Sequence, residues 1–361
     1  MRPATASAYA PGRVELLGNH TDYNEGLVLA AAIDRGLTVS GSRRDDHVIS
    51  ISSKTLARRI EIPRSALRPQ TEEGWANYAL GVASELIARG IPIDGFSAGV
   101  DGDLPAGCGL SSSAAFEVAT AFFLLKLCGL ALPSLEIAKV CQRAEHRFVG
   151  VQSGLLDQVT SIFGRADQLV FFDCRSEKVR NVPFPAELAL IITQSGTKRE
   201  LSKGEYNERR KQTLAASHAL GIGALRDISS SELARRHEID SLLRRRASHV
   251  VGENERVKRA LNLLACGDSR AFGALMNASH ESSRTNFENS TRELDLLVDL
   301  ARELPGVLGA RLTGAGFGGA TVTLCERKFA AHAADELARR YAEKTGMKPQ
   351  TFVCRIADGA S

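Results

Sequence analysis

Residues 113–128, SAAFEVATAFFLLKLC, form a segment that is apolar on nearly all sides. Only Glu117 and Lys126 carry a charge, so the segment has no continuous polar face to turn toward water. A helix with this pattern is buried rather than amphipathic. We therefore predict a buried helix here, around which the rest of the chain must supply a core.

The segments around it predict a mixture of strands and helices. Residues 37–42 and 48–53 alternate apolar and polar side chains with the period of a strand. A helix is expected over 75–90, with Gly90 just past its end, and another over 134–149, with Ser134 as its N-cap. The other expected elements are apolar strands at 168–174 and 188–193, charged helices across 201–300, and an alternating strand after a glycine-rich loop at 313–319. Because strands and helices do not alternate regularly, this pattern favours an α+β fold, and a length of 361 residues favours two domains.

Composition excludes several classes of function. The net charge of +4 is mild, and short basic runs such as residues 244–246 lack interleaved aromatic side chains, so we expect no nucleic-acid partner. The seven cysteines include no C-x-x-C pair, which argues against a disulfide framework and a structural zinc site. The first residues lack the apolar segment of a signal peptide, and no run reaches the ~18 apolar residues of a membrane span. We expect a cytoplasmic protein that does not contact membranes.

The stretch PAGCGLSSSAA, residues 105–115, has the composition of a phosphate-binding turn. Gly107 and Gly109 allow the backbone to turn sharply and to approach a ligand, and three serines then lead into the buried helix. Free N–H groups and the dipole at a helix N-terminus favour an anion, and serine hydroxyls can bind phosphate or Mg²⁺. The stretch is neither a P-loop nor a G-x-S-x-G elbow. A capped helix after a glycine turn is the structural alternative, but the second glycine-rich loop, TGAGFGG at 313–319, favours a nucleotide.

Three stretches together resemble the GHMP small-molecule kinases and, within them, the galactokinases. GRVELLGNHTDYNEG at 12–26 is similar to the signature G-R-x-N-x-[LI]-G-E-H-x-D-Y. GLSSSAAFEVA at 109–119 and GARLTGAGFGG at 309–319 are similar to the second and third motifs of the family. Five further segments resemble galactokinases in the same order along nearly the whole chain: 75–82, 143–158, 204–212, 248–257 and 275–298.

The resemblance implies ATP-dependent phosphorylation of a hexose at its anomeric hydroxyl, with galactose as the first candidate substrate. It implies two lobes with the site between them: residues 1–180, similar to the second domain of ribosomal protein S5, and residues 181–361, similar to ferredoxin. A galactokinase-like sugar sensor without activity is a second hypothesis, although such regulators tend to have a damaged phosphate motif and this one is complete. A kinase for a non-sugar such as mevalonate is disfavoured by the HTDYN loop. We expect a monomer with sugar and ATP as its small-molecule partners.

The resemblance also implies a role for individual residues. Asp157 would be the catalytic carboxylate that takes the proton of the hydroxyl or holds it in line, with Arg13 beside it to stabilise the transferred phosphoryl group. Mg²⁺ would be held by Ser113 and Glu145, since this ion typically takes one or two protein oxygens. The sugar would be bound by Arg13, Asn19, His20, Asp22, Gly154, Asp157 and Tyr206. ATP would be bound by Gly107, Cys108, Gly109, Leu110, Ser111, Ser112 and Ser113.

One departure from the signature bears on the choice of sugar. Asn19 stands where galactokinases usually carry glutamate, at a position that the resemblance places against the C6 hydroxyl. Asparagine can still bond a hydroxyl, so galactose remains the first expectation, but the loss of a negative charge would also tolerate a C6 carboxylate, as in galacturonate. A pentose that lacks C6 is a third possibility. Two smaller departures, Glu15 in place of asparagine and Ala320 in place of cysteine, are interpreted as structural.

Overall fold

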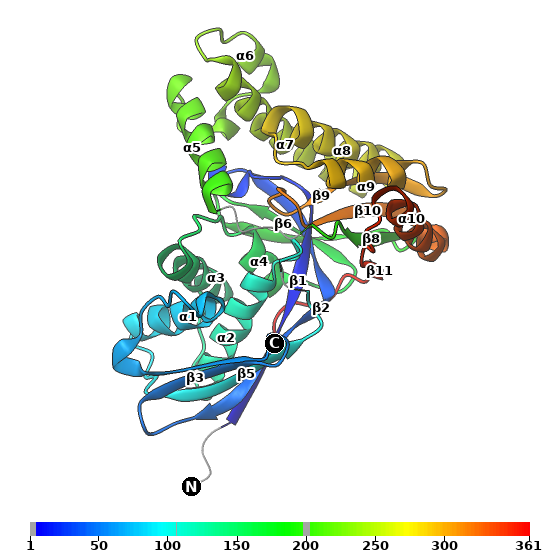
Figure 1. Ribbon diagram of the computed structural model, residues 1–361. Coiled ribbons are helices and arrows are strands. Elements are labelled where there is room, and N and C mark those ends of the chain that lie inside the picture. The colour runs from blue at the N-terminus through cyan, green and yellow to red at the C-terminus, as the bar shows by residue number, and fades with distance from the viewer. Residues whose placement is uncertain (1–4, 106, 198–202) are drawn as a thin grey trace.

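The computed structural model describes residues 5–105, 107–197 and 203–361. It has two lobes, each built on one sheet, as Figure 1 shows. The fold is α+β, as expected. In the view of Figure 1 the second lobe lies above the first, and β1 runs between them.

The first lobe contains a seven-stranded sheet in the order β4-β3-β5-β2-β6-β7, with β1 paired to β2. Only the β3–β5 pair is parallel. The strand expected at 37–42 is the end of a much longer β2, because the run from Leu27 to Ile33 is buried on both faces and therefore shows no alternation. The strands are β1 Thr5–Leu17, β2 Leu27–Arg43, β3 Val48–Ser53, β4 Arg58–Pro63, β5 Phe96–Gly102, β6 Gln168–Asp173 and β7 Lys178–Pro183.

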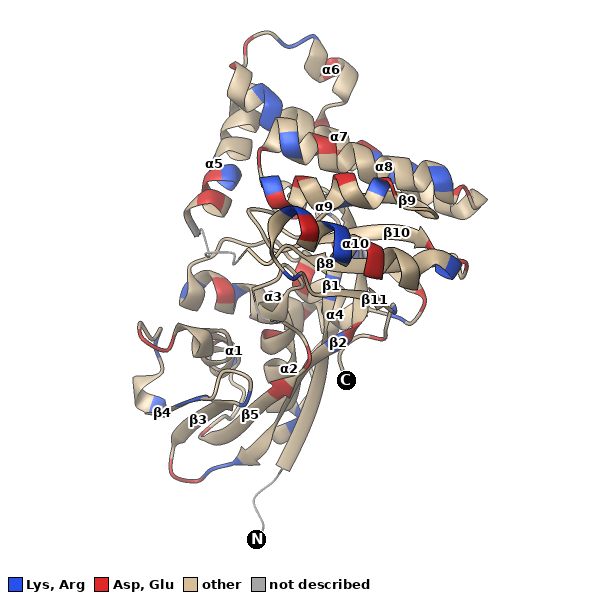
Figure 2. Cartoon of the chain, turned by 45° about the vertical axis from the view of Figure 1, so that its right-hand side comes forward, with Lys and Arg blue, Asp and Glu red and all other residues tan. Residues whose placement is uncertain are grey.

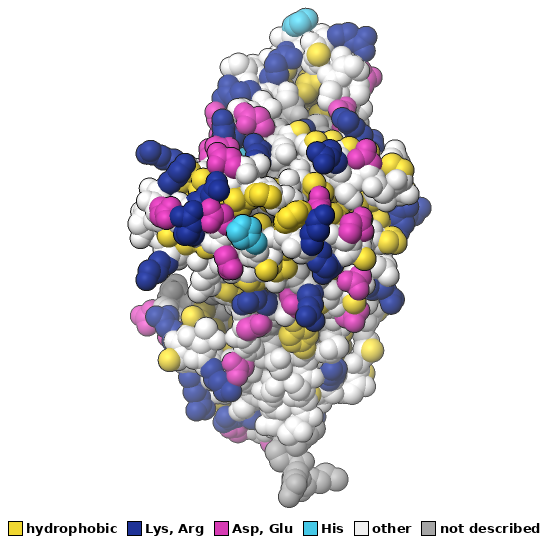
Figure 3. Space-filling view, turned by 90° about the vertical axis from the view of Figure 1, so that its right-hand side faces the viewer, with side chains coloured by type: hydrophobic (Ala, Val, Ile, Leu, Met, Phe, Trp, Pro, Cys, Tyr) yellow, Lys and Arg dark blue, Asp and Glu magenta, His cyan; other side chains and the backbone are white. Residues whose placement is uncertain are grey.

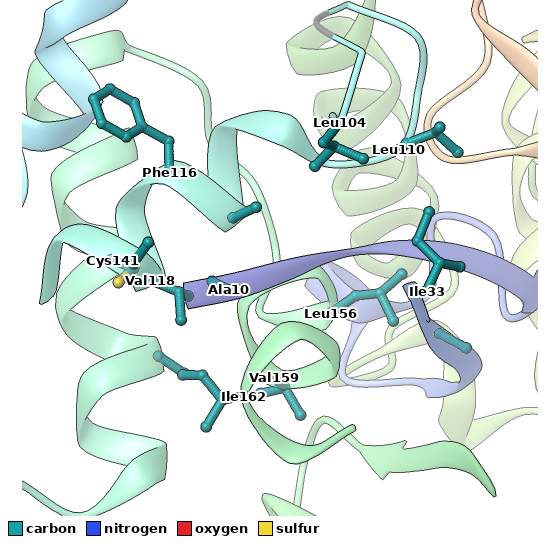
Figure 4. Close-up of a cluster of buried hydrophobic side chains, with 14 of the residues drawn as sticks. Ala10, Ile33, Leu104, Leu110, Phe116, Val118, Cys141, Leu156, Val159 and Ile162 are labelled. Carbon is teal, nitrogen blue, oxygen red and sulfur yellow. The ribbon is translucent and has the colours of Figure 1, made fainter. Parts of the chain in front are cut away.

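Two helices, α2 Ser112–Leu127 and α4 Leu156–Phe163, pack on this sheet. Two more, α1 Asn77–Ala88 and α3 Ser134–Ala144, pack on each other and on α2. The buried helix expected at 113–128 is confirmed as α2, which packs against β1, α1, α3 and α4. Figure 4 shows Phe116 and Val118 of α2 in a cluster with Ala10 of β1 and Ile162 of α4.

Two details of the expected helices are wrong. The α-helix that starts after Pro133 ends at Ala144, and the chain continues in one wider turn over Glu145–Val149. Ser134 is the first helical residue rather than the N-cap, because Pro133, extended at ψ 138°, takes the cap position. By contrast, Gly90 follows α1 with φ at +84°, as expected for a residue just past a helix end.

The second lobe contains an antiparallel sheet in the order β11-β8-β10-β9, with β8 Leu188–Gln194, β9 Val307–Thr313, β10 Ala320–Glu326 and β11 Thr351–Cys354. This is the 4-1-3-2 order of a ferredoxin-like sheet, as expected. Charged helices fill the described part of 201–300, again as expected. The helices are α5 Lys203–Ala219, α6 Ser230–Ala234, α7 Ser241–Cys266, α8 Ser269–Ser282, α9 Arg292–Arg302 and α10 Ala330–Thr345. Shorter turns lie at Asp22–Asn24, Arg64–Ala66, Gly74–Ala76, Leu225–Asp227, Ser283–Phe287 and Arg327–Phe329.

The surface mixes charges of both signs. Figure 2 marks acidic and basic residues along α9 and α10. On α10, Glu336 pairs with Arg339 and Arg340. Figure 3 shows the same mixture, with apolar side chains between the charges, on the face that includes these helices. Within the described ranges, no helix combines the length and the apolar character needed to span a membrane.

The two lobes are joined by more than the connecting chain. In the cleft, the backbone N–H of Glu15 on β1 donates to Thr313 Oγ1 on β9 at 2.8 Å. Residues 355–361 leave the second lobe and return to the first, where Ser361 and Tyr9 exchange two backbone hydrogen bonds of 2.9 and 3.0 Å. The division expected between residues 180 and 181 falls inside β7, and the boundary between the lobes remains a prediction.

Candidate active site

A cleft of roughly 880 Å³, its mouth included, opens between the lobes. It brings together residues that are far apart in the sequence: every residue expected to bind sugar, and both expected metal ligands, line it. These are Arg13, Asn19, His20, Asp22, Ser113, Glu145, Gly154, Asp157 and Tyr206. The other residues expected to bind ATP, 107–112, are outside this lining and form the turn beside it.

Arg13 and Asp157 form an ion pair in the wall of the cleft. The Arg13 Nε–H donates to Asp157 Oδ1 at 2.7 Å, and Nη2 lies 2.6 Å from the same oxygen. Arg13 is 4% exposed, and its Nη1 donates to the carbonyl oxygen of Gly109 at 2.8 Å. The second Asp157 oxygen, Oδ2, accepts from Ser111 Oγ at 2.5 Å. The guanidinium and the serine therefore fix the carboxylate from both sides.

The turn at 107–113 presents the N-terminus of α2 toward this region. Gly107 and Gly109 have φ at +73° and +75°, and Ser111, at φ +58°, precedes the helix; no side-chain bond caps its described first turn. Leu110 anchors the turn in the core (Figure 4). Such an uncapped N-terminus offers free N–H groups to an anion.

The second glycine-rich loop lies against this turn. A Cβ on Gly109 would come 3.1 Å from the Thr313 carbonyl oxygen, and one on Gly319 would come 3.3 Å from the backbone of Cys108. The Cys108 thiol donates to Gln194 Oε1 at the end of β8. The two loops that suggested a nucleotide therefore form one surface.

The loop that follows β1 is held by buried hydrogen bonds. His20, with φ at +59°, has Nε2 2.9 Å from the carbonyl oxygen of Ala315 and Nδ1 2.7 Å from the Tyr23 hydroxyl. Because a carbonyl only accepts, Nε2 carries the proton, and Nδ1 accepts from Tyr23. Burial raises the pKa of Tyr23 well above 10, so this phenol keeps its proton. The ring of Tyr206, on α5, lies 5.3 Å from the His20 ring.

Asp22 and Gly154 depend on each other. A Cβ on Gly154 would lie 2.0 Å from Asp22 Oδ2, so only glycine lets the backbone approach this carboxylate. Burial, and next the charge of Asp157, raise the pKa of Asp22 to about 7. The cleft therefore holds an acid that exchanges its proton near neutral pH.

Helix α7 supports the same loop, which the sequence did not indicate. Glu253 Oε2 accepts from the backbone N–H groups of Gly18 and Asn19 at 2.8 and 2.9 Å, and His249 Nε2 lies 3.1 Å from the Asn19 carbonyl oxygen. Burial alone would raise the pKa of Glu253, but the charges of Arg256 and Arg311 hold it below its usual value. Burial lowers the pKa of His249 to about 3, so this imidazole is neutral and donates through Nε2.

Asn19 and Glu15 contact each other directly. Asn19 Nδ2 donates to Glu15 Oε2 at 2.9 Å and to the carbonyl oxygen of Gly314 at 2.8 Å. Its Oδ1 accepts from Asn289 Nδ2 at 2.9 Å. Both Asn19 and Glu15 are 1% exposed, and both line the cleft.

Glu145 and Ser113, which also line the cleft, offer two hard oxygen ligands. Glu145 is 8% exposed and accepts from Ser153 Oγ, which also lines the cleft. Gln158 Nε2 donates to the buried Glu117 at 3.0 Å and lies 3.5 Å from Glu145. Within the described residues, no group of three or more His, Cys, Asp or Glu side chains could hold a metal. This donor set fits an ion that takes few protein ligands and completes its shell with phosphate and water, as Mg²⁺ does.

Several residues of the lining were not expected from the sequence. Ser153 stands directly before Gly154, and Gly314, Ala315 and Phe317 belong to the second glycine-rich loop, so these segments were noticed although the residues were not. Glu15, interpreted as structural, also lines the cleft. Tyr78, Val151 and Leu156 also line the cleft. They lie in the galactokinase-like segments 75–82 and 143–158, but no role was expected for them individually.

Comparisons with known proteins agree along the whole chain. Residues 2–43 match the galactokinase galactose-binding signature, residues 77–165 the GHMP kinases N terminal domain, and residues 257–343 the GHMP kinases C terminal model. The galactokinase of Roseiflexus sp. (strain RS-1) is 42% identical over 97% of this chain and 91% of its own length. That of Chloroflexus aurantiacus is 42% identical over 99% and 94%.

Solved structures give the same result. The crystal structure of Lactococcus lactis galactokinase complexed with galactose matches with a TM-score of 0.94 and 34% identity over 99% of this chain and 95% of that one. A mevalonate kinase structure matches with a TM-score of 0.69 at 20% identity, which shows a shared fold only.

Proposed function

The chain belongs to the galactokinase family of the GHMP kinases, and from this premise we propose that it phosphorylates galactose with ATP at the anomeric hydroxyl. The observation that carries the proposal is the Arg13–Asp157 pair, which lies in the cleft between the sugar loop and the two glycine-rich loops.

Asp157 has one free position for the sugar. A carboxylate oxygen has two lone pairs, and Arg13 occupies both at Oδ1, whereas Ser111 occupies one at Oδ2. A hydroxyl bound at Oδ2 is oriented by a fixed carboxylate. Because phosphoryl transfer passes through a loose transition state, such orientation supplies much of what the reaction needs.

The reaction then balances as follows. The anomeric oxygen forms a bond to the γ-phosphorus of ATP, the bond from that phosphorus to the bridging oxygen breaks, and ADP leaves with the electron pair. The hydroxyl proton leaves toward Asp157 Oδ2. The Arg13 guanidinium lies where it can stabilise charge on the transferred group, and the free N–H groups of α2 can bind the phosphates.

We propose that Ser113 and Glu145 hold the Mg²⁺ that accompanies ATP. Both side chains line the cleft, and a hydroxyl with a carboxylate is an oxygen donor set that suits this ion. When bound, Mg²⁺ neutralises charge on the phosphates. Ser153, which donates to Glu145, keeps that carboxylate in its orientation.

The remaining assignments are proposals of the same kind. His20, Asp22, Gly154 and Tyr206 form the wall that would contact the sugar. Galacturonate is the second candidate substrate, and the observation behind it is the neutral Asn19. A sugar sensor is disfavoured because Arg13, Asp157 and Glu145 are all in place. We also expect a monomer, located in the cytoplasm.

The test is ADP release with Mg-ATP and galactose, galacturonate, N-acetylgalactosamine, arabinose or glucose, followed by NMR of the product. We expect turnover with galactose and phosphate on C1. If no sugar is turned over while galactose still binds, the protein is a sensor and the proposal is wrong. Phosphorylation at another carbon would contradict the proposed placement of the sugar.

A further inference from the structure

We propose that Glu15, and not Asn19, is the residue that determines which sugar this cleft accepts: its carboxylate receives a hydroxyl and disfavours an anionic group such as that of a uronate. This inference rests on the proposed function and on the resemblance to galactokinases, which places position 19 against the C6 hydroxyl. It concerns a position at which this chain departs from the signature. It also argues against galacturonate, which became a candidate because Asn19 is neutral.

Asn19 has no capacity left for a ligand. A side-chain amide has two donor hydrogens and two acceptor positions. Both hydrogens of Asn19 are used, by Glu15 Oε2 and by the carbonyl oxygen of Gly314. Its oxygen accepts from Asn289 at 2.9 Å and lies 3.4 Å from the Ser283 hydroxyl.

The orientation of the Asn19 amide is also fixed. The Gly314 carbonyl only accepts, so the NH₂ group must face it, and the Asn289 amide donates from the other side. A sugar could reach Asn19 only by breaking a buried hydrogen bond, which costs about 1–3 kcal/mol for each group left unpaired.

Glu15, unlike Asn19, still has an acceptor oxygen without a hydrogen-bond partner among the described residues. Its Oε2 accepts from Asn19, but its Oε1 has no hydrogen-bond partner among the described residues, although the side chain is buried in the lining of the cleft. A buried polar atom without a partner is unusual in a native structure, because leaving it unpaired is costly. A donor supplied by the substrate would satisfy it, and a sugar hydroxyl is such a donor.

The pKa of Glu15 lies above its usual value, and burial is the largest cause of this shift. Burial raises the pKa of Glu15, but Arg311 and next Arg13 oppose this effect, and so does the hydrogen bond from Asn19. Arg311 is fully buried on β9, and none of its guanidinium nitrogens has a hydrogen-bond partner in the described chain. Its positive charge acts on both Glu15 and Glu253, and no carboxylate among the described residues is hydrogen-bonded to it.

The consequence is that an ionised Glu15 gives the cleft the negative charge that Asn19 lacks. The galactokinase signature has asparagine at position 15 and glutamate at position 19, and this chain has the two residue types exchanged. A carboxylate of the substrate would enter a cleft that is lined by Glu15 and also by Asp22. Like charges in a poorly solvated site repel, so uronates should be rejected.

The experiment compares kcat/KM for galactose and galacturonate in the wild type and in Glu15→Gln. It is done at about pH 8, because the raised pKa of Glu15 calls for a basic solution to ionise its carboxyl group. We expect the wild type to prefer galactose by about 100-fold or more, and the variant to reduce this ratio at least ~10-fold, mainly through KM. A variant that stays active with an unchanged ratio overturns the proposal. So does a wild type that uses galacturonate within about tenfold of galactose. Absence of any turnover in the wild type would instead contradict the proposed function.

Two further variants distinguish an effect on sugar specificity from an effect on folding. Glu85→Gln changes another buried glutamate, which pairs with Arg143 and Arg147 outside the cleft, and should lower stability without altering the ratio. The double exchange Glu15→Asn with Asn19→Glu should recover the preference for galactose that Glu15→Asn alone loses. If this exchange folds but does not recover it, the carboxylate is not the determinant and the inference is wrong.

Discussion

The hydroxyl of Ser111 offers a sharp test of how the carboxylate of Asp157, the proposed catalytic group, is positioned. The resemblance implied that this serine binds ATP. In the structure its Oγ donates a hydrogen bond to Asp157 Oδ2 at 2.5 Å. We predict that Ser111→Ala lowers kcat and leaves the KM for ATP nearly unchanged. The variant keeps the backbone N–H groups of the turn and removes only the bond that fixes Oδ2.

The size of the effect follows from the exposure of Asp157. A hydrogen bond to a charged group contributes about 1.5–3 kcal/mol. Because the Asp157 side chain is 32% exposed, water can replace part of this interaction, and the lower end of the range applies. About 1.4 kcal/mol corresponds to about a tenfold decrease in kcat.

The assay is steady-state kinetics with ATP and galactose varied separately, together with nucleotide binding measured by calorimetry. The matched control is Ser230→Ala on α6, which removes a similar hydrogen bond, from Ser230 Oγ to Glu255 Oε2 at 2.8 Å, outside the cleft. Its kcat should equal that of the wild type. If Ser111→Ala instead raises the KM for ATP tenfold at constant kcat, the hydroxyl binds phosphate and our reasoning is refuted.

Three further predictions concern the acids of the cleft. Asp157→Asn should abolish ADP release while calorimetry still detects ATP binding; near-normal activity would contradict the assigned role. Glu145→Gln should raise the Mg²⁺ concentration for half-maximal rate by about tenfold or more, since one charged ligand is lost; an unchanged Mg²⁺ dependence would exclude Glu145 as a ligand. The pKa of Asp22 is raised from 3.8 to about 7, so this group stabilises the fold fully below about pH 4 and loses that contribution as the pH rises through 7. The melting temperature of the unliganded wild type should therefore fall relative to that of Asp22→Asn between about pH 4 and 7. Above pH 7 the difference between the two melting temperatures should stay constant. A difference that does not change with pH would show that the pKa of Asp22 is not raised.

The sequence predicted those parts of the fold that depend on local pattern. The apolar character of 113–128 identified α2 because burial on all sides leaves a signal in the residues themselves. The turn at 107–113 and the loop at 313–319 were recognised because glycines there permit φ angles near +75°. The resemblance then supplied the residues of the cleft, and the structure brings them to one place.

What the sequence could not give are contacts between distant segments. Ser111 and Asp157 are separated by 46 residues, and nothing at either position indicates that they meet. Glu253 holds the Gly18–Asn19 backbone across more than 230 residues. For the same reason, only the structure shows that Glu15 Oε1 has no hydrogen-bond partner among the described residues. From the sequence alone, Glu15 in place of asparagine was interpreted as a structural substitution.

The return of residues 355–361 to the first lobe constrains how the chain is made. Their backbone groups bond to those of Tyr9, Ala32, Asp34 and Gly164, all in segments that leave the ribosome hundreds of residues earlier. Domains usually fold in the order of their synthesis. Here the lobe that is translated first stays incomplete until residues 355–361 have been made. Backbone groups of β1, which carries the proposed catalytic arginine, and of β2 beside it therefore stay unpaired until then. A chaperone that binds nascent chains would therefore have the longest time to bind at these backbone groups of β1 and β2.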